Sequence, residues 1–150
     1  MNLDRKIYLF VLILAAVSLT GCGILGGDTP PGLTLSGDGE DITVGAGTYC
    51  WGGLCADGIY PPVVDTFVQL PADGQVTLEF GRPKPDSLFL ALDSYDTFPE
   101  ADSAASTRLE TVPDTISWTP DVPPGEYVLS VTARWDRGND AAYHLGVGVP

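Results

Sequence analysis

Apolar and polar residues alternate with a period of two along much of the chain after residue 32. Val76, Leu78 and Phe80 alternate with polar neighbours, and the segments 127–135 and 141–149 repeat the pattern. Similar runs lie at 41–49, 65–70 and 116–118, whereas the run 87–93 is apolar on both faces. Because successive side chains of a strand point to opposite faces of a sheet, this period predicts β-strands.

Turn-forming residues separate the alternating runs, as at 61–62, 72–74, 82–85 and 123–125. Beyond residue 22 no amphipathic run is long enough to predict a helix. The longest irregular stretch is 93–106, where we expect a helical turn near 100–105. Seven or eight short strands with frequent turns predict an all-β fold, an antiparallel sandwich.

The segment 123–131 reads Pro-Pro-Gly-Glu-Tyr-Val-Leu-Ser-Val. It resembles the penultimate strand of bacterial immunoglobulin-like domains, and the likeness extends over about 27 residues. The resemblance implies an Ig-like sandwich with Tyr127 packed near a corner between the sheets. Leu129 stands where antibody domains carry a cysteine, so the usual disulfide between the sheets is not expected. A fold resemblance of this kind implies no function.

The first 22 residues have the pattern of an export signal. Arg5 and Lys6 precede an uncharged apolar run, 7–20, which is too short to cross a bilayer comfortably and is typical of a secretory signal peptide. The next residues, Leu-Thr-Gly-Cys at 19–22, resemble the lipobox of bacterial lipoproteins. That resemblance implies removal of residues 1–21 and acylation of Cys22, which would anchor the chain stably to a membrane.

The lipoprotein resemblance also bears on location and organisation. In that family, Gly23 in place of an aspartate permits delivery to the outer membrane where one exists. Residues 22–32 are rich in glycine and proline and predict the lipidated cysteine followed by a tether. The remaining stretch, 33–150, is long enough for one β-sandwich domain. We therefore expect a lipid-anchored, extracytoplasmic protein of the cell envelope, at the outer membrane or cell surface.

Net charge narrows the classes of partner. The whole chain has 20 acidic and 7 basic residues. Removal of residues 1–21 takes away Asp4, Arg5 and Lys6, so the mature charge is 5 minus 19, or −14. Nucleic acids and anionic lipid headgroups require basic surfaces, so this charge argues against both.

The segment Tyr49-Cys50-Trp51-Gly52-Gly53-Leu54-Cys55 holds the two cysteines that lipidation leaves free. In an oxidising compartment such a pair usually forms a disulfide, and the two glycines let the chain turn back sharply. A redox centre would need C-x-x-C at a helix start, and the spacing here is C-x4-C. A zinc site would need Cys50, Cys55, His144 and an acidic ligand. Blue copper would need two histidines, whereas the chain has one.

This region also resembles a loose group of small bacterial lipoproteins. The shared features are Tyr-Cys-Trp at 49–51, Cys55, Asp57, Gly-Glu-Tyr at 125–127 and Trp135. The resemblance supports the sandwich fold and the disulfide, and it carries no activity.

Catalytic motifs are absent from the sequence. The chain has one histidine, His144, and no G-x-S-x-G, phosphate-loop or H-E-x-x-H pattern. We expect a protein that is not an enzyme and has no cofactor. Calcium is the metal that the acidic loops could hold, although no spacing matches an EF-hand. The candidate calcium ligands are Asp93, Asp96, Glu100 and Asp102.

Aromatic residues offer a further candidate surface. The period of two places Trp118, Trp135 and Tyr143 on core faces, whereas Trp51 and Tyr60 flank the cysteine loop and are expected in an exposed ligand patch. We expect a binding, adhesion or structural accessory module, attached to the membrane through Cys22 and contacting an envelope protein or glycan. The alternative is a small calcium- or zinc-binding envelope lipoprotein.

Overall fold

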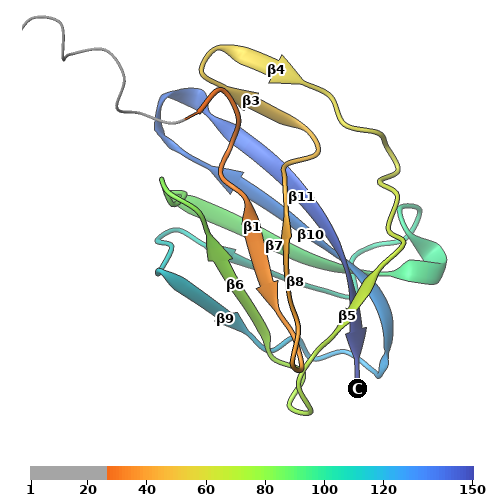
Figure 1. The fold of residues 1–150 in the computed structure, drawn as a ribbon. Helices are drawn as coiled ribbons and strands as arrows, with labels where there is room; N and C mark the ends of the chain where they lie inside the picture. The colour runs from red at the N-terminus through yellow and green to blue at the C-terminus, as the bar shows by residue number, and fades with distance from the viewer. Residues whose placement is uncertain (1–26) are drawn as a thin grey trace, which may run out of the picture.

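The computed structural model describes residues 27–150, which form two facing β-sheets (Figure 1). The expected signal peptide, Cys22 and the start of the expected tether lie outside the described residues. The elements are β1 Leu33–Ser36, β2 Asp41–Val44, β3 Tyr49–Trp51, β4 Leu54–Ala56, β5 Phe67–Gln69, β6 Val76–Phe80, β7 Ser87–Ser94, the 3-10 turn η1 Tyr95–Thr97, β8 Ala105–Leu109, β9 Thr115–Trp118, β10 Gly125–Arg134, the 3-10 turn η2 Asp136–Gly138 and β11 Asp140–Val149.

The smaller sheet has the order β2-β1-β6-β9, and the larger sheet has the order β4-β3-β11-β10-β7-β8. These neighbours are antiparallel, and β5 joins the larger sheet by pairing in parallel with β11. The predicted antiparallel Ig-like sandwich is therefore confirmed, with eleven strands in place of the expected seven or eight. Within residues 27–150 no helix is long and apolar enough to cross a membrane.

The strand count differs because several short strands carry weak signals. The single run expected at 41–49 is two strands in different sheets, since β2 belongs to the smaller sheet and β3 to the larger. Strands β1, β4 and β8 were not expected, and β8 is mostly polar. The helical turn expected near 100–105 is found earlier, as η1. Neighbouring strands, rather than their own patterns, hold these short segments in place.

The core lies between the two sheets. Alternate residues of the long strands point inward, as predicted, and Leu129 and Tyr143 are fully buried. They face fully buried leucines of the smaller sheet, Leu33, Leu35 and Leu78. Burial of this apolar surface is the main force that holds the sheets together.

Tyr127 fastens one corner of the sandwich. Its side chain is buried, and its hydroxyl donates a hydrogen bond to the backbone oxygen of Pro123 at 2.8 Å. This contact is the tyrosine corner of immunoglobulin-like sandwiches. The expected position of Tyr127 near a corner is confirmed.

The strands run between two opposite ends of the sandwich. We call one the tether end, because Gly27 lies there; its loops are 52–53, 81–86, 110–114 and 135–139 (Figure 1). The other, the far end, has the loops 37–40, 70–75, 95–104 and 119–124 and the C-terminus (Figure 1). Strands β10 and β11 have ten residues each, so the ends are about 33 Å apart.

The variant Tyr127→Phe should lower the free energy of unfolding by about 1 kcal/mol, because it leaves the Pro123 oxygen without its donor. Equilibrium urea unfolding measures the change. Tyr60→Phe is the matched control, since Tyr60 is 71% exposed. Equal stability of the two variants would contradict a stabilising role for the corner.

Candidate functional site

An open hollow of about 1040 Å³ lies at the tether end. Three chain segments line it: the β3–β4 turn, the loop 82–86 and the β10–β11 turn. The nearly buried rings of Trp51 and Trp135 form its inner wall. Three cationic side chains, Arg82, Lys84 and Arg137, and two acidic ones, Asp86 and Asp136, stand around it. Its volume matches that of sites that accept small ligands.

Aromatic rings in edge-to-face contact underlie the hollow. The ring centroids of Trp51 and Trp135 are 5.0 Å apart, with planes at 90°. Phe80 continues the series, 6.0 Å from Trp135 and 5.6 Å from Tyr143. Edge-to-face pairs of this kind add stability beyond the area that they bury. The cluster therefore gives the hollow a rigid inner wall.

The polar groups of these rings hold three backbone segments in place. Trp51 Nε1 donates to the Gly27 oxygen at 3.1 Å, and Trp135 Nε1 donates to the Pro83 oxygen at 2.9 Å. The Tyr143 hydroxyl donates to the Pro31 oxygen at 2.7 Å, and burial raises the pKa of that phenol. The loop 82–86 and the segment 27–32 are thus fixed to the core.

The sequence predicts that Trp51 and Tyr60 lie in one exposed patch. The structure buries Trp51 and exposes only Tyr60. Trp51 is 7% exposed, because Trp135 and Gly27 cover its ring. Tyr60 is exposed as expected, next to Ile59 at 80% and Val63 at 78%. This apolar strip follows β4, and its nearest aromatic neighbour is Phe98, 6.5 Å away between ring centroids. Trp51 lines the hollow and Tyr60 does not.

The cysteine segment forms a tight hairpin at the edge of the hollow. Gly52 and Gly53 have φ angles of 60° and 86°, the left-handed region that a two-residue turn needs. Cys50 and Cys55 are directly opposite on β3 and β4 and form the expected disulfide. The Gly52 amide donates to Asn139 Oδ1 at 3.0 Å, which joins this hairpin to the β10–β11 turn.

The expected metal ligands are not brought together. The disulfide takes both thiols that a zinc site with His144 would use. Within residues 27–150 no group of three or more histidine, cysteine or acidic side chains is arranged to hold a metal ion. This includes the expected calcium ligands, Asp93, Asp96, Glu100 and Asp102.

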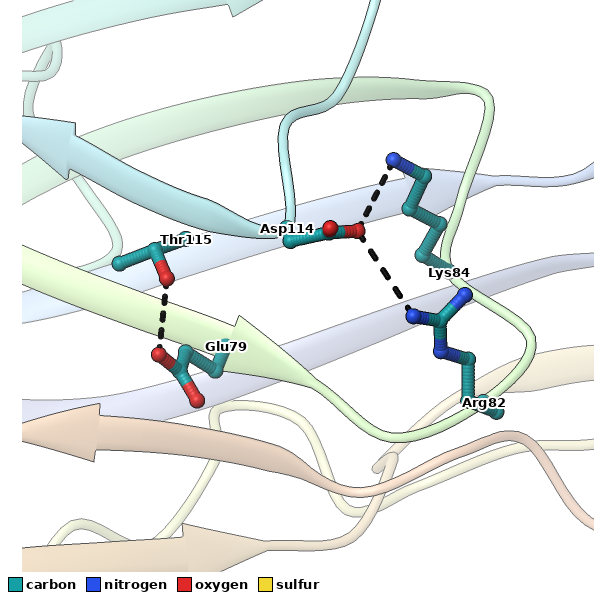
Figure 2. A network of polar contacts seen from close by, with 5 residues as sticks. All are labelled: Glu79, Arg82, Lys84, Asp114 and Thr115. Atoms are coloured by element: carbon teal, nitrogen blue, oxygen red, sulfur yellow. Dashed lines mark hydrogen bonds and ion pairs between the residues drawn. The ribbon is translucent and has the colours of Figure 1, made fainter.

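Ion pairs organise the cations of the hollow (Figure 2). Lys84 Nζ donates to Asp114 Oδ1 at 3.1 Å, and an Arg82 guanidinium nitrogen lies 3.9 Å from the same oxygen. The hydrogen bond from Lys84, then its charge and that of Arg82, lower the pKa of Asp114. Exposed pairs of this kind add little stability. Their effect is to hold two cations side by side.

Arg137 adopts a backbone conformation that is unusual for its residue type. Its φ of 60° and ψ of 22° lie in the left-handed region, inside η2. A residue with a Cβ pays about 1–2 kcal/mol for this conformation. Its side chain is 79% exposed, and its Nε lies 3.7 Å from Asp136 Oδ2. The turn thus places a cation beside the hollow at a cost that glycine would avoid.

Asp93, Ser130 and His144 form a second polar group, on the outer face of the larger sheet. Ser130 Oγ donates to Asp93 Oδ2 at 3.2 Å and lies 3.2 Å from His144 Nδ1. Which of Ser130 and His144 is the donor depends on the tautomer of the imidazole. The three side chains form a hydrogen-bonded chain across β7, β10 and β11.

Comparison of this chain with protein-family models, curated proteins and solved structures gave no match.

Replacing both cysteines, as Cys50→Ala with Cys55→Ala, should lower the free energy of unfolding by about 2 kcal/mol, because the crosslink closes a short loop. Urea unfolding of oxidised protein measures the loss. The same protein with reductant should match the double variant. Equal stability in all three samples would show that the crosslink does not contribute.

His144 should make stability depend on pH. Burial lowers the pKa of His144 from its ordinary 6.5, and the charge of Asp93 partly offsets the effect. The unfolded chain then takes up a proton more readily than the folded one, so stability falls as pH drops below about 6.5. Urea unfolding at several pH values should show that the free energy of unfolding falls less with pH in the variant His144→Asn. Identical pH profiles of the variant and the unaltered protein would contradict the lowered pKa of His144.

Proposed function

We propose that the protein is a lipid-anchored, extracytoplasmic binding module, without enzymatic activity, that holds an anionic group in the hollow at the tether end. One observation carries the proposal. Residues 27–150 contain five lysines and arginines, and three of these line one hollow in a strongly acidic chain. Asp114 and Asp136 pair with these cations and limit their mutual repulsion, and the exposed cationic side chains remain accessible to an anionic ligand.

The chemistry of the hollow suits phosphate or carboxylate. Arginine guanidinium groups bind the oxygens of both through paired hydrogen bonds, and lysine supplies a compact charge. Arg82 and Lys84 already share one oxygen of Asp114, which shows that the two side chains can converge on a single oxyanion. A ligand with more than one anionic oxygen could replace this carboxylate and also engage Arg137.

Catalysis and metal binding find less support. Ser130 contacts both Asp93 and His144, but no G-x-S-x-G pattern surrounds it. The acidic loops do not converge on a common point within the described residues. The lipid anchor is supported by the basic start, the apolar run 7–20 and the lipobox-like cysteine of the sequence.

The proposal predicts that inorganic phosphate binds at the hollow. Amide chemical shifts of the full acylated protein, held in a non-ionic detergent, should move at 52–53, at 82, 84 and 86, and at 136–138 during a phosphate titration. The double variant Arg82→Gln with Lys84→Gln should bind at least tenfold more weakly, since each charged hydrogen bond contributes about 1.5 kcal/mol or more.

Arg108→Gln is the matched control for loss of charge. Arg108 lies outside the hollow, over the ring of Phe89 at 5.7 Å. The variant Arg108→Gln should bind phosphate as tightly as the unaltered protein does. Equal weakening in the control and the double variant, or an absence of shifts at the hollow, would refute the proposed site.

A further inference from the structure

Basic side chains are unevenly distributed along the sandwich. Arg82, Lys84 and Arg137 lie in loops of the tether end, Arg134 is the last residue of β10, and Arg108 pairs with Phe89 near the start of β7. The far end has no lysine or arginine. Its ten acidic residues are Asp38, Glu40, Asp41, Asp73, Asp93, Asp96, Glu100, Asp102, Asp121 and Glu126.

The tether end also carries acidic residues, among them Asp86, Glu110 and Asp140, and two of its acids are paired with its cations. Asp114 contacts Lys84 and Arg82, and Asp136 contacts Arg137. Across about 33 Å the molecule therefore changes from a mixed end to a purely acidic end. This separation exceeds the Debye length of about 8 Å at physiological salt, so a surface near one end is screened from the other.

The chain leaves the domain at the mixed end. The oxygens of Gly27, Pro31 and Gly32 accept hydrogen bonds from Trp51, Tyr143 and the Gly81 amide. These contacts hold 27–32 against the sandwich. Cys22 precedes Gly27 by five residues, which can span at most about 18 Å. An acyl group on Cys22 would keep the tether end close to the lipid.

We infer that the hollow faces the membrane that holds the acylated Cys22, and that Arg82, Lys84 and Arg137 contact phosphates of its lipid headgroups. The inference rests on the proposed function and names the anion that the hollow holds. The Arg82 and Arg137 side chains are 82% and 79% exposed, so both can reach a surface. The net charge of the chain argues against contact with lipid headgroup phosphates, but the basic residues are absent from the far end and lie toward the tether end.

An apolar side chain at the same end supports this orientation. Leu54 follows the Gly52–Gly53 turn and is 67% exposed. Exposed apolar and cationic side chains at the same end are typical of surfaces that rest at the boundary between headgroups and acyl chains. The acidic far end would point away from the membrane, where anionic headgroups would otherwise repel it.

Paramagnetic broadening tests the orientation. The full acylated protein is placed in bilayers of phosphatidylcholine and phosphatidylglycerol that contain a gadolinium-chelating headgroup lipid. Amides at 52–54, at 82, 84 and 86, and at 136–139 should be broadened more strongly than amides at 37–40 and 72–75. Equal broadening at both ends, or stronger broadening at the far end, would overturn the inference.

Two changes isolate the contact with phosphate. The variant Arg82→Gln, Lys84→Gln, Arg137→Gly removes the three cations, and glycine suits the left-handed position of residue 137. Loss of each cation should weaken the preference for the orientation with the tether end at the membrane by up to about fivefold. Bilayers of a neutral, phosphate-free galactolipid should weaken this preference similarly. If both changes leave the difference in broadening between the two ends unaltered, the phosphate contact is overturned. Arg108→Gln is the control variant.

The outcomes also separate this inference from the proposed function. If free phosphate shifts the amides of the hollow in detergent but broadening on the bilayer is uniform, the orientation is wrong and the anion site stands. If free phosphate produces no shifts at the hollow, the proposed function fails, and the orientation loses its basis with it.

Discussion

The arrangement of the tether end depends on one cluster of aromatic rings. Trp51, Trp135, Phe80 and Tyr143 contact one another edge to face. Their polar groups bind backbone oxygens of Gly27, Pro83 and Pro31. Because the rings are rigid and three of them are buried, the residues before β1 and the loop with Arg82 and Lys84 take fixed positions relative to the core. Without the cluster, the positions of Arg82 and Lys84 relative to the segment 27–32 would not be fixed.

The fold could be predicted from the sequence because the long strands carry strong periodic signals. In β10 and β11 the alternate apolar residues of 127–133 and 141–147 are buried, and the turn before Tyr127 forms the expected corner. The disulfide could be predicted from the expected oxidising compartment and from the two glycines between the cysteines. Strands such as β8 could not, because their pairing partners, rather than their own residues, decide their conformation.

The candidate site was harder to predict because its residues are distant in sequence. Arg82, Lys84 and Arg137 look like scattered surface charges until the fold brings their loops together. Trp51 was expected to be exposed, since the sequence does not reveal that Trp135 covers it. A usable signal was present in the scarcity of cations: five in residues 27–150, against nineteen acids. Rare charges of one sign merit attention before the fold is known.

The central claim is that the lipid anchor and the cationic hollow belong to the same end of the molecule. That claim depends first on acylation of Cys22. The most direct measurement is mass spectrometry of the N-terminal peptide of the protein isolated from membranes. The account predicts a peptide that begins at residue 22 and carries the mass of acyl chains on its cysteine. A peptide with an unmodified Cys22, or one that still contains the residues before it, would contradict the account.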